Sequence, residues 1–518
     1  MSINRHLGCW REVFLNFSYG RDGRFDRRLI LGLLLFAFLL RIPLLIYPEV
    51  IRNDGTQYIR HARQILSGDW WSMGRTHPFY PSLIALFHFF TPNDETAGIL
   101  ISVIFGALLV VPVFFLGKAL FNEKVGMVAA LLASVHPFTY TFSGSVLTES
   151  TYYFLLATSV FLGWKAFEKG RWTDVSLFGF FTALSYLTRL EAIGFLLIFG
   201  IWAGLINPPD GKRGWVKRVG IVLLATFCFL IVSSPYLIQL RRTTGEWQIT
   251  RKISISAGSL TGQEEASVNR IRETKKITLL AFVKSPFVVA KQVAVGFLQS
   301  LYKFQQAFNP LLVVFLILGF VLAGENPFSI KINLYVLTCC VYLLGFIFPF
   351  FRVDRRYSSH IIPICLPWAA FGFLQALGWI RGNFGERKVP GKLAAISLAV
   401  ILVVLFVQGR VIHSGDHRLI QKEVGYWMRD HLPPGAGVMS SEAQEAFYAE
   451  RPWLYMPEGS FEEILQEARS KNAQFLVFRD KDGKAFDDLQ KKAREREWIA
   501  LLDRRMRGWR AIVFQRVD

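Results

Sequence analysis

Acidic and basic side chains that could perform group transfer stand at the ends of the long apolar runs of this chain. Asp54 follows the first apolar run, Glu149 opens a later run, and Arg189 lies in the turn after another. A carboxylate can accept a proton from a hydroxyl group. Arginine can hold the oxygens of a phosphate group in a bidentate arrangement. Together these residue types suit a cavity on which carboxylates and arginines converge and in which the arginines bind a phosphate group.

The stretch from residue 47 to residue 92 carries several of the candidate residues. Polar side chains recur at roughly helical spacing from Asp54 to Gln64, which predicts a helix that lies along the membrane surface. Asp54 stands at the start of this helix, where its carboxylate either caps exposed amides or faces a substrate. Tyr58, Arg75 and His77 are further candidates in this stretch. Arg75 and His77 have a structural alternative, which is to shape the turn before a proline.

Three later turns between apolar runs also present charged side chains. Glu149 either stabilises the N-terminus of a helix or lines a cavity. Arg189 and Glu191 share a turn, where they form a structural ion pair or a membrane anchor. The functional alternative is that Arg189 binds a phosphate group. The turn at 354–357 either anchors lipid headgroups or binds a phosphate-linked donor. Its candidate residues are Arg355, Arg356 and Tyr357.

The composition indicates a polytopic membrane protein. Hydrophobic residues make up 52% of the 518 residues, which is too apolar for an ordinary soluble protein. The apolar residues form runs near 20 residues long, enough to cross roughly 30 Å of hydrocarbon. We place about eleven spans, and segments 77–91 and 277–300 are ambiguous. The spans are expected at about 29–47, 97–117, 125–143, 149–167, 174–188, 191–207, 219–239, 308–323, 331–349, 359–378 and 393–409.

The basic residues predict how the chain crosses the membrane. Residues 1–28 are rich in arginine and precede an apolar run without a convincing cleavage site, which predicts an uncleaved anchor with a cytoplasmic N-terminus. A membrane domain of residues 29–410 with an odd number of spans then places loops 48–96 and 240–307 outside, together with residues 411–518. All the candidate residues above would therefore lie at the outer face.

Residues 411–518 are polar and predict a small extracytoplasmic α/β domain. Short strands are expected at 437–441, 474–478 and 511–515, and helices at 417–432, 461–472 and 485–498. Strands that alternate with helices over about 100 residues are typical of such a domain.

Several function classes are disfavoured. The net charge of +20 is spread over loops between apolar runs, and no nucleic-acid-binding module is recognisable, so the charge indicates contact with membrane lipids or phosphate rather than nucleic acid. None of the five cysteines falls in a long loop, so no disulfide framework is predicted. No phosphate-binding loop of an ATP-driven pump is present, and no strong internal repeat indicates a secondary transporter.

Five short motifs carry a family resemblance. They are N-D-G-x-x-Y from Asn53, T-H-P-F-Y-P from Thr76, V-L-T-E ending at Glu149, L-T-R-L-E from Leu187, and R-R-Y-S-S-H-I-I-P-I from Arg355. In this order and at these loop positions they resemble the GT-C glycosyltransferases. The resemblance is closest to the bacterial branch related to protein O-mannosyltransferases and the aminoarabinose transferase of lipid A, and it covers roughly residues 29–410.

The resemblance implies a sugar donor carried on polyprenyl phosphate, transfer to an acceptor hydroxyl on the outer face, and inversion at the anomeric carbon. It matches Asp54 and Glu149 to the two catalytic acids of the family. We choose Asp54 as the base, and Glu149 would orient the acceptor or hold a metal ion. We assign the donor phosphate to Arg75, Arg189, Arg355 and Arg356, and substrate contacts to Tyr58, His77, Glu191 and Tyr357. The family more often has a double acid where Asn53 precedes Asp54 here. Metal use therefore stays open, and a divalent ion would bind Asp54 and Glu149.

Two other functions stay open at this point. One is a polytopic lipid or glycan transporter, and the other is a polymerase or ligase that acts on a polyprenyl-diphosphate glycan. A transporter would carry ionisable residues near the middle of the membrane, whereas the charges here gather at the predicted outer boundary. The acceptor is a lipid, a glycan or a protein, and the resemblance points to a bacterial inner membrane.

Overall fold

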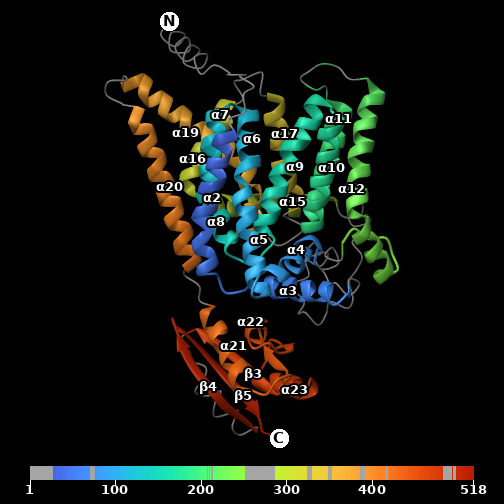
Figure 1. The fold of residues 1–518 in the computed structure, drawn as a ribbon, viewed down its shortest axis with the longest axis vertical. Helices are drawn as coiled ribbons and strands as arrows, with labels where there is room; N and C mark the ends of the chain where they lie inside the picture. The colour runs from blue at the N-terminus through green and yellow to red at the C-terminus, as the bar shows by residue number, and fades with distance from the viewer. Residues whose placement is uncertain are drawn as a thin grey trace.

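A helical membrane domain and a small C-terminal domain with a sheet make up the described part of the chain. The computed structural model describes residues 27–69, 76–206, 208, 211, 214–250, 286–323, 330–347, 353–384, 391–414, 418–481, 493 and 497–517. The C-terminal domain lies beyond one end of the helical bundle, at the bottom of Figure 1. This combination confirms the predicted fold class.

The membrane domain is built almost entirely from helices. Its first part contains α2 (Arg27–Ile46), α3 (Asn53–Leu66), α4 (Phe79–Phe87), α5 (Asp94–Leu108), α6 (Val110–Leu120), α7 (Glu123–Val135), α8 (Pro137–Ser143), α9 (Glu149–Lys169) and α10 (Trp172–Thr188). Its second part contains α11 (Ile193–Leu205), α12 (Trp215–Thr244), α15 (Pro286–Phe308), α16 (Pro310–Ala323), α17 (Ile330–Val341), α18 (Arg355–Ser358), α19 (Ile362–Phe384) and α20 (Gly391–Ser414). Short helical turns are η1 (His88–Phe90), η2 (Leu190–Ala192), η4 (Tyr342–Ile347) and η6 (Ser359–Ile361).

Several of these helices have the length and composition of membrane spans. Within the described ranges, 5 helices are long and apolar enough to cross a membrane, and 7 result if each of two bent pairs counts as one span. Three shorter apolar helices lie at 79–90, 190–205 and 330–345. These findings indicate a multi-pass membrane protein, and the count of about eleven spans stays a prediction.

The predicted span at 125–143 is a bent pair of helices. The axes of α7 and α8 differ by 52°, and the break falls at His136. Pro137 follows directly and occupies the first turn of α8, where its missing amide hydrogen is not needed. The His136 imidazole caps the new helix by accepting from the Phe138 amide at 3.2 Å. A proline one residue after the break therefore explains the bend.

Two glycines allow α16 and α19 to cross closely. A Cβ atom placed at Gly319 would lie 1.9 Å from the Trp368 carbonyl oxygen, and one at Gly372 would lie 2.0 Å from the Phe315 carbonyl oxygen. Small residues at helix crossings let backbones approach, which is the usual way that helices associate in membranes. This crossing fixes α19, and with it the turn of α18 that precedes it.

The C-terminal domain contains a five-stranded sheet in the order β2-β1-β3-β5-β4. Its elements are α21 (Leu419–His431), β1 (Val438–Ser440), α22 (Gln444–Tyr448), β2 (Trp453–Tyr455), α23 (Phe461–Ser470), β3 (Phe475–Lys481), β4 (Trp498–Met506) and β5 (Trp509–Arg516). Strand β1 pairs in parallel with β2 and β3, whereas β5 pairs antiparallel with β3 and β4. The three predicted strands and the helices at α21 and α23 are confirmed.

Two strands of this sheet were not predicted. Strand β2 has only three residues, too few for an alternating pattern. Strand β4 begins at Trp498, where a helix was expected to end, and the rest of that predicted helix falls largely outside the described residues. The prediction is wrong at Trp498 itself, because this residue pairs with Arg516 of β5 and packs in the core of the domain.

Helix α3 lies at the end of the bundle that carries the C-terminal domain. Figure 1 shows α3 running across this end, below the long helices and beside α4. Its buried residues include Tyr58, Ile59, Ala62 and Ile65, which recur at helical spacing, so one face packs on the bundle. The predicted helix from Asp54 is therefore confirmed, and its first turn points toward the ends of α9 and α18.

Candidate active site

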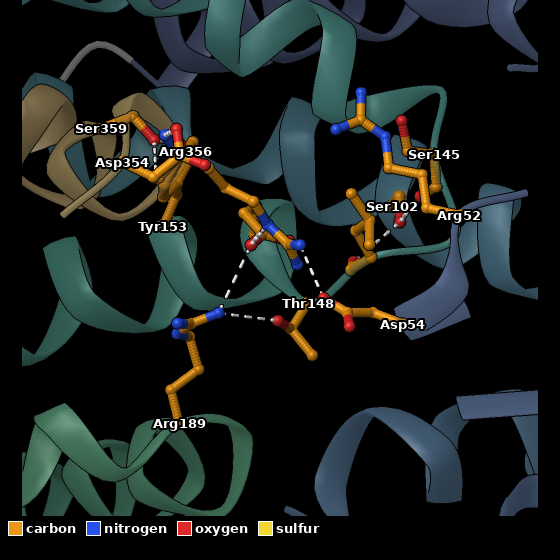
Figure 2. A network of polar contacts seen from close by, with 12 residues as sticks. Arg52, Asp54, Ser102, Ser145, Thr148, Tyr153, Arg189, Asp354, Arg356 and Ser359 are labelled. Atoms are coloured by element: carbon orange, nitrogen blue, oxygen red, sulfur yellow. Dashed lines mark hydrogen bonds and ion pairs between the residues drawn. The ribbon is translucent and has the colours of Figure 1, made fainter. Parts of the chain in front are cut away.

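Arg356 joins the two candidate carboxylates. Its Nη1 lies 2.6 Å from Oδ2 of Asp54, and its Nε donates a short hydrogen bond to Oε1 of Glu149. The three residues come from the first turns of α3, α9 and α18, which lie far apart in sequence. Figure 2 shows the Arg356 side chain reaching from α18 toward Asp54. The structure therefore brings these three turns, which were predicted to converge, to one place.

Arg189 approaches Glu149 from another side. Its Nη1 lies 3.4 Å from Oε1 of Glu149 and 3.4 Å from Oγ1 of Thr148. Figure 2 marks the contact between Arg189 and Thr148 with a dashed line. Its Nη2 lies 3.1 Å from Oε1 of Glu191. The guanidinium carbon also sits 5.0 Å from the centre of the Tyr357 ring, a cation–π distance. Arg189, Glu191 and Tyr357 therefore belong to the same cluster as Glu149.

Local sequence explains how these side chains reach the cluster. The Asp354 carboxylate caps α18 by accepting a hydrogen bond from the Arg356 amide at 3.3 Å, and the helix therefore begins at Arg355. Arg189 ends α10 with an extended backbone, so its side chain leaves the helix direction. Glu149 is the first residue of α9, where a carboxylate is favourable near the positive end of the helix dipole.

The members of the cluster differ in exposure. The Glu149 side chain is 0% exposed and Arg189 is also buried, whereas the Asp54 side chain is 42% exposed. Buried charges are retained only where they are paired, and Glu149 is paired with both arginines. Asp54 is therefore the more accessible of the two carboxylates, and Glu149 is the one that contacts both guanidinium groups.

Tyr58 follows Asp54 by one helical turn. Its side chain is buried, and its ring packs edge-on against Tyr80 with centroids 5.4 Å apart. Burial, and after it the neighbouring Asp54 carboxylate, raises the pKa of the Tyr58 phenol above its ordinary value. The phenol therefore keeps its proton and can serve as a hydrogen-bond donor beside Asp54, but not as a base.

The other predicted residues lie outside this ion-pair cluster. His77 is buried beside the Tyr186 ring, with its Nε2 3.3 Å from Oγ1 of Thr250. Arg355 is exposed and, in the part of the chain that the structure describes, makes none of the cluster's ion pairs. Arg75 falls outside the described residues. The assignments of these three residues stay predictions.

Two aromatic residues of the cluster were not predicted. Tyr152 places its ring 5.6 Å from the Arg189 guanidinium carbon, and the Tyr153 hydroxyl makes a short hydrogen bond with the Ser359 hydroxyl. Both follow Glu149 at a spacing of three and four residues on α9, so all three side chains share one face of that helix. This spacing is the signal in the sequence that could have identified them.

The C-terminal domain contacts the segment that leads into α3. The Ala443 amide donates to Oδ1 of Asn53 at 2.9 Å, and the Ile51 amide donates to the Tyr448 hydroxyl at 3.0 Å. Arg418 forms an ion pair with Glu49. Asn53, the residue before Asp54, therefore contacts the C-terminal domain directly.

Glu49 is ionised at this junction between the domains. Burial acts to raise the pKa of its carboxyl group, but the nearby Arg52 and Arg418 outweigh burial and lower the pKa to about 2. Arg52 lies 2.6 Å from the Glu49 carboxylate. The position of the first turn of α3 thus depends on charges from both domains.

The arrangement does not fit a divalent metal ion. Asp54 and Glu149 are the two carboxylates that would bind it, but the Arg356 guanidinium group lies between them and donates a hydrogen bond to each. No group of three His, Cys, Asp or Glu side chains suited to a metal occurs among the described residues. Arg356 supplies the positive charge between the two carboxylates.

Comparison with solved structures shows that the chain has the fold of the GT-C membrane glycosyltransferases, as the motifs predicted. The ArnT protein from Cupriavidus metallidurans bound to undecaprenyl phosphate aligns with a TM-score of 0.56 and 12% identity, over 95% of this chain and 99% of that chain. The archaeal oligosaccharyltransferase AglB from Archaeoglobus fulgidus, in complex with an inhibitory peptide and a dolichol-phosphate, aligns with a TM-score of 0.58 and 14% identity, over 87% of this chain and 69% of that chain.

One segment also matches a family at the level of sequence. Residues 76–238 match the family described as dolichyl-phosphate-mannose-protein mannosyltransferase. This segment is less than half of the chain and includes Glu149, Arg189 and Glu191. No curated protein matches the chain in sequence.

Proposed function

We propose that this protein is an integral membrane glycosyltransferase. It transfers a sugar from a polyprenyl-phosphate donor to an acceptor hydroxyl group, with inversion at the anomeric carbon. The observation that carries the proposal is the bridge of Arg356 between Asp54 and Glu149, which unites three distant segments. Two solved structures with this fold contain dolichol-phosphate and undecaprenyl phosphate, which supports a donor of the same chemical class.

Arg356 and Arg189 stabilise the leaving group. When the bond between the sugar and the phosphate breaks, the phosphate gains about one negative charge, and preorganised cations stabilise that charge most in a site with little water. Glu149 contacts both guanidinium groups and is itself buried, so it fixes their positions before the donor arrives. Arg189 is further held by Glu191 and by the Tyr357 ring.

Asp54 removes the proton of the acceptor hydroxyl. In the structure its carboxylate is paired with Arg356, and an opposite charge at this distance makes a carboxylate a weaker base. A donor phosphate that binds Arg356 competes with Asp54 for the guanidinium group. Donor binding therefore releases Asp54 and raises its basicity, so that deprotonation is coupled to the presence of the donor.

The distribution of charge favours transfer over transport. Helix α3 runs across the end of the bundle that carries the C-terminal domain (Figure 1), and Asp54 stands in its first turn. Glu149, Arg189 and Arg356 are joined to Asp54 by ion pairs, so the charged cluster lies at this end rather than at the middle of the bundle. Residues that move a substrate through the bilayer would be expected nearer the middle. We propose that this end faces the periplasm of a bacterial inner membrane and that the N-terminus is cytoplasmic.

Deletion of the gene in the organism of origin is expected to remove one sugar residue from an envelope lipid, glycan or protein. Mass spectrometry should show this loss and the accumulation of the sugar-charged polyprenyl phosphate, because the donor is made but not used. Re-expression of the protein should reverse both changes. Unchanged glycans would contradict the proposal, and loss of a whole oligosaccharide would identify a polymerase or ligase instead.

A further inference from the structure

A cavity lies between the membrane domain and the C-terminal domain, apart from the candidate active site. Its volume is about 220 Å³. The outer ends of α2 and α5 form one wall, and α21 of the C-terminal domain forms the other. Residues that matter below line it: Leu45, Ile46, Glu95, Ile99, Lys422 and Tyr426. Drug-sized ligands usually occupy about 300–1,000 Å³, so this cavity suits a smaller group.

Lys422 brings an ammonium group that is not engaged in a hydrogen bond within the described residues. Its Nζ lies 3.8 Å from the Glu95 carboxylate, which is longer than a hydrogen bond. The rings of Tyr448 and Tyr426 lie 5.0 Å and 5.8 Å away and hold the cation by cation–π contact. The donors of this ammonium group are therefore open to an anionic oxygen.

Glu95 brings the opposite charge to the same cavity. Its side chain is only 14% exposed, and its Oε1 accepts one hydrogen bond from the Tyr448 hydroxyl at 2.7 Å. The Lys422 ammonium group is 3.8 Å away, so the Glu95 carboxylate has no cation within hydrogen-bond distance among the described residues. A ligand with one negative and one positive end would satisfy both residues, whereas Glu95 would repel a ligand that is only anionic.

The cavity opens where the apolar surface of the protein ends. Along α2, Leu31, Leu35 and Leu39 are exposed, and so is Ile46 at the rim of the cavity. Exposed leucines along a membrane span face lipid tails, so the rim lies near the level of the lipid headgroups. Leu45, Ile46 and Ile99 give the cavity an apolar side, and Glu95 and Lys422 give it a charged side.

We propose that this cavity binds the headgroup of a phosphoethanolamine-type phospholipid from the surrounding leaflet. The phosphate oxygens accept hydrogen bonds from Lys422, and the primary ammonium group donates to Glu95. Glu95 belongs to α5 and Lys422 to α21, so the bound headgroup links the two domains. The link lies beside Tyr448, which also contacts the segment leading to Asp54. The site does not depend on the proposed transferase activity.

Native mass spectrometry of the purified full-length protein in detergent tests this site. The protein is titrated with phosphatidylethanolamine, phosphatidylglycerol and phosphatidylcholine that have identical acyl chains. One molecule of phosphatidylethanolamine should bind in preference to the other two. Lys422→Met should weaken this binding about tenfold or more, because a hydrogen bond to a charged group is lost. Glu95→Gln should remove the preference over phosphatidylglycerol.

Control variants keep the result interpretable. Lys422→Arg should retain binding, and Lys471→Met should behave like the wild type, because Lys471 follows α23 and pairs with Glu467 away from the cavity. Comparable thermal unfolding of all the variants without lipid shows that they are folded. Equal binding of the Lys422→Met and wild-type proteins would overturn the proposal. So would equal binding of phosphatidylglycerol by the wild type, or displacement of the lipid by inorganic phosphate alone.

Discussion

Asp54→Asn is expected to nearly abolish transfer while the protein stays folded and still binds the donor. An asparagine has the same shape and can still accept a hydrogen bond from Arg356, but it cannot take the acceptor's proton. Loss of a general base typically slows a reaction by about 10²–10⁴-fold. Membranes of a deletion strain contain both the accumulated donor and the acceptor. The initial rate of product formation after addition of purified protein measures the effect.

Asp69→Asn is the matched control for this substitution. Asp69 lies just beyond the other end of α3 and is exposed. Its substitution by asparagine therefore removes one negative charge, as Asp54→Asn does, without altering the ion-pair cluster. This variant should transfer at the wild-type rate. Transfer by Asp54→Asn at the wild-type rate would remove Asp54 as the base, even if the protein is a glycosyltransferase.

Arg356→Lys is expected to lower the rate of transfer by about 10²-fold or more, the usual cost of removing one preorganised group that stabilises transition-state charge. A lysine ammonium group is a point charge and cannot bridge Asp54 and Glu149 as the planar guanidinium group does. The same membrane assay measures this loss. A rate within a factor of two of the wild type would show that the bridge is not needed.

Arg356→Ala should in addition destabilise the fold. It leaves Glu149, which is 0% exposed, with only the longer contact to Arg189. Removal of one partner from a buried ion pair typically costs about 3–5 kcal/mol. The lysine variant is therefore the better probe of function, and thermal unfolding of the two variants separates the two effects.

The sequence predicts that the site residues meet because they occupy turns on one side of the membrane. Asp54, Glu149, Arg189 and Arg356 each stand at the end of an apolar run, and the predicted order of spans places all these ends at one face. The sequence could not predict that Arg356 bridges both carboxylates, since this depends on how α18 packs against α3 and α9. It also could not predict that Asn53 contacts Ala443, which is 390 residues away in the chain.

The fold was predictable where the periodic spacing of apolar and polar residues extended over many residues. Helix α3 follows from the spacing after Asp54, and α23 follows from an apolar stripe behind a capping box at Ser460 and Glu463. Strand β4 was missed because its pairing shifts register between Ala500 and Leu502, which breaks the alternation that marks a strand. The bend at His136 was missed because an apolar run indicates how long a helix is but not where its axis changes direction.

The central claim is that the ion-pair cluster binds the donor phosphate. Measuring how tightly undecaprenyl phosphate binds to Arg356→Lys and to Arg355→Lys tests this claim most directly. Arg355 and Arg356 adjoin in sequence, but only Arg356 enters the ion-pair cluster, and Arg355 is exposed. If the cluster is the donor phosphate site, Arg356→Lys should weaken binding about tenfold or more, and Arg355→Lys should have a smaller effect. Equal binding by the wild type and Arg356→Lys, or a loss confined to Arg355→Lys, would contradict it.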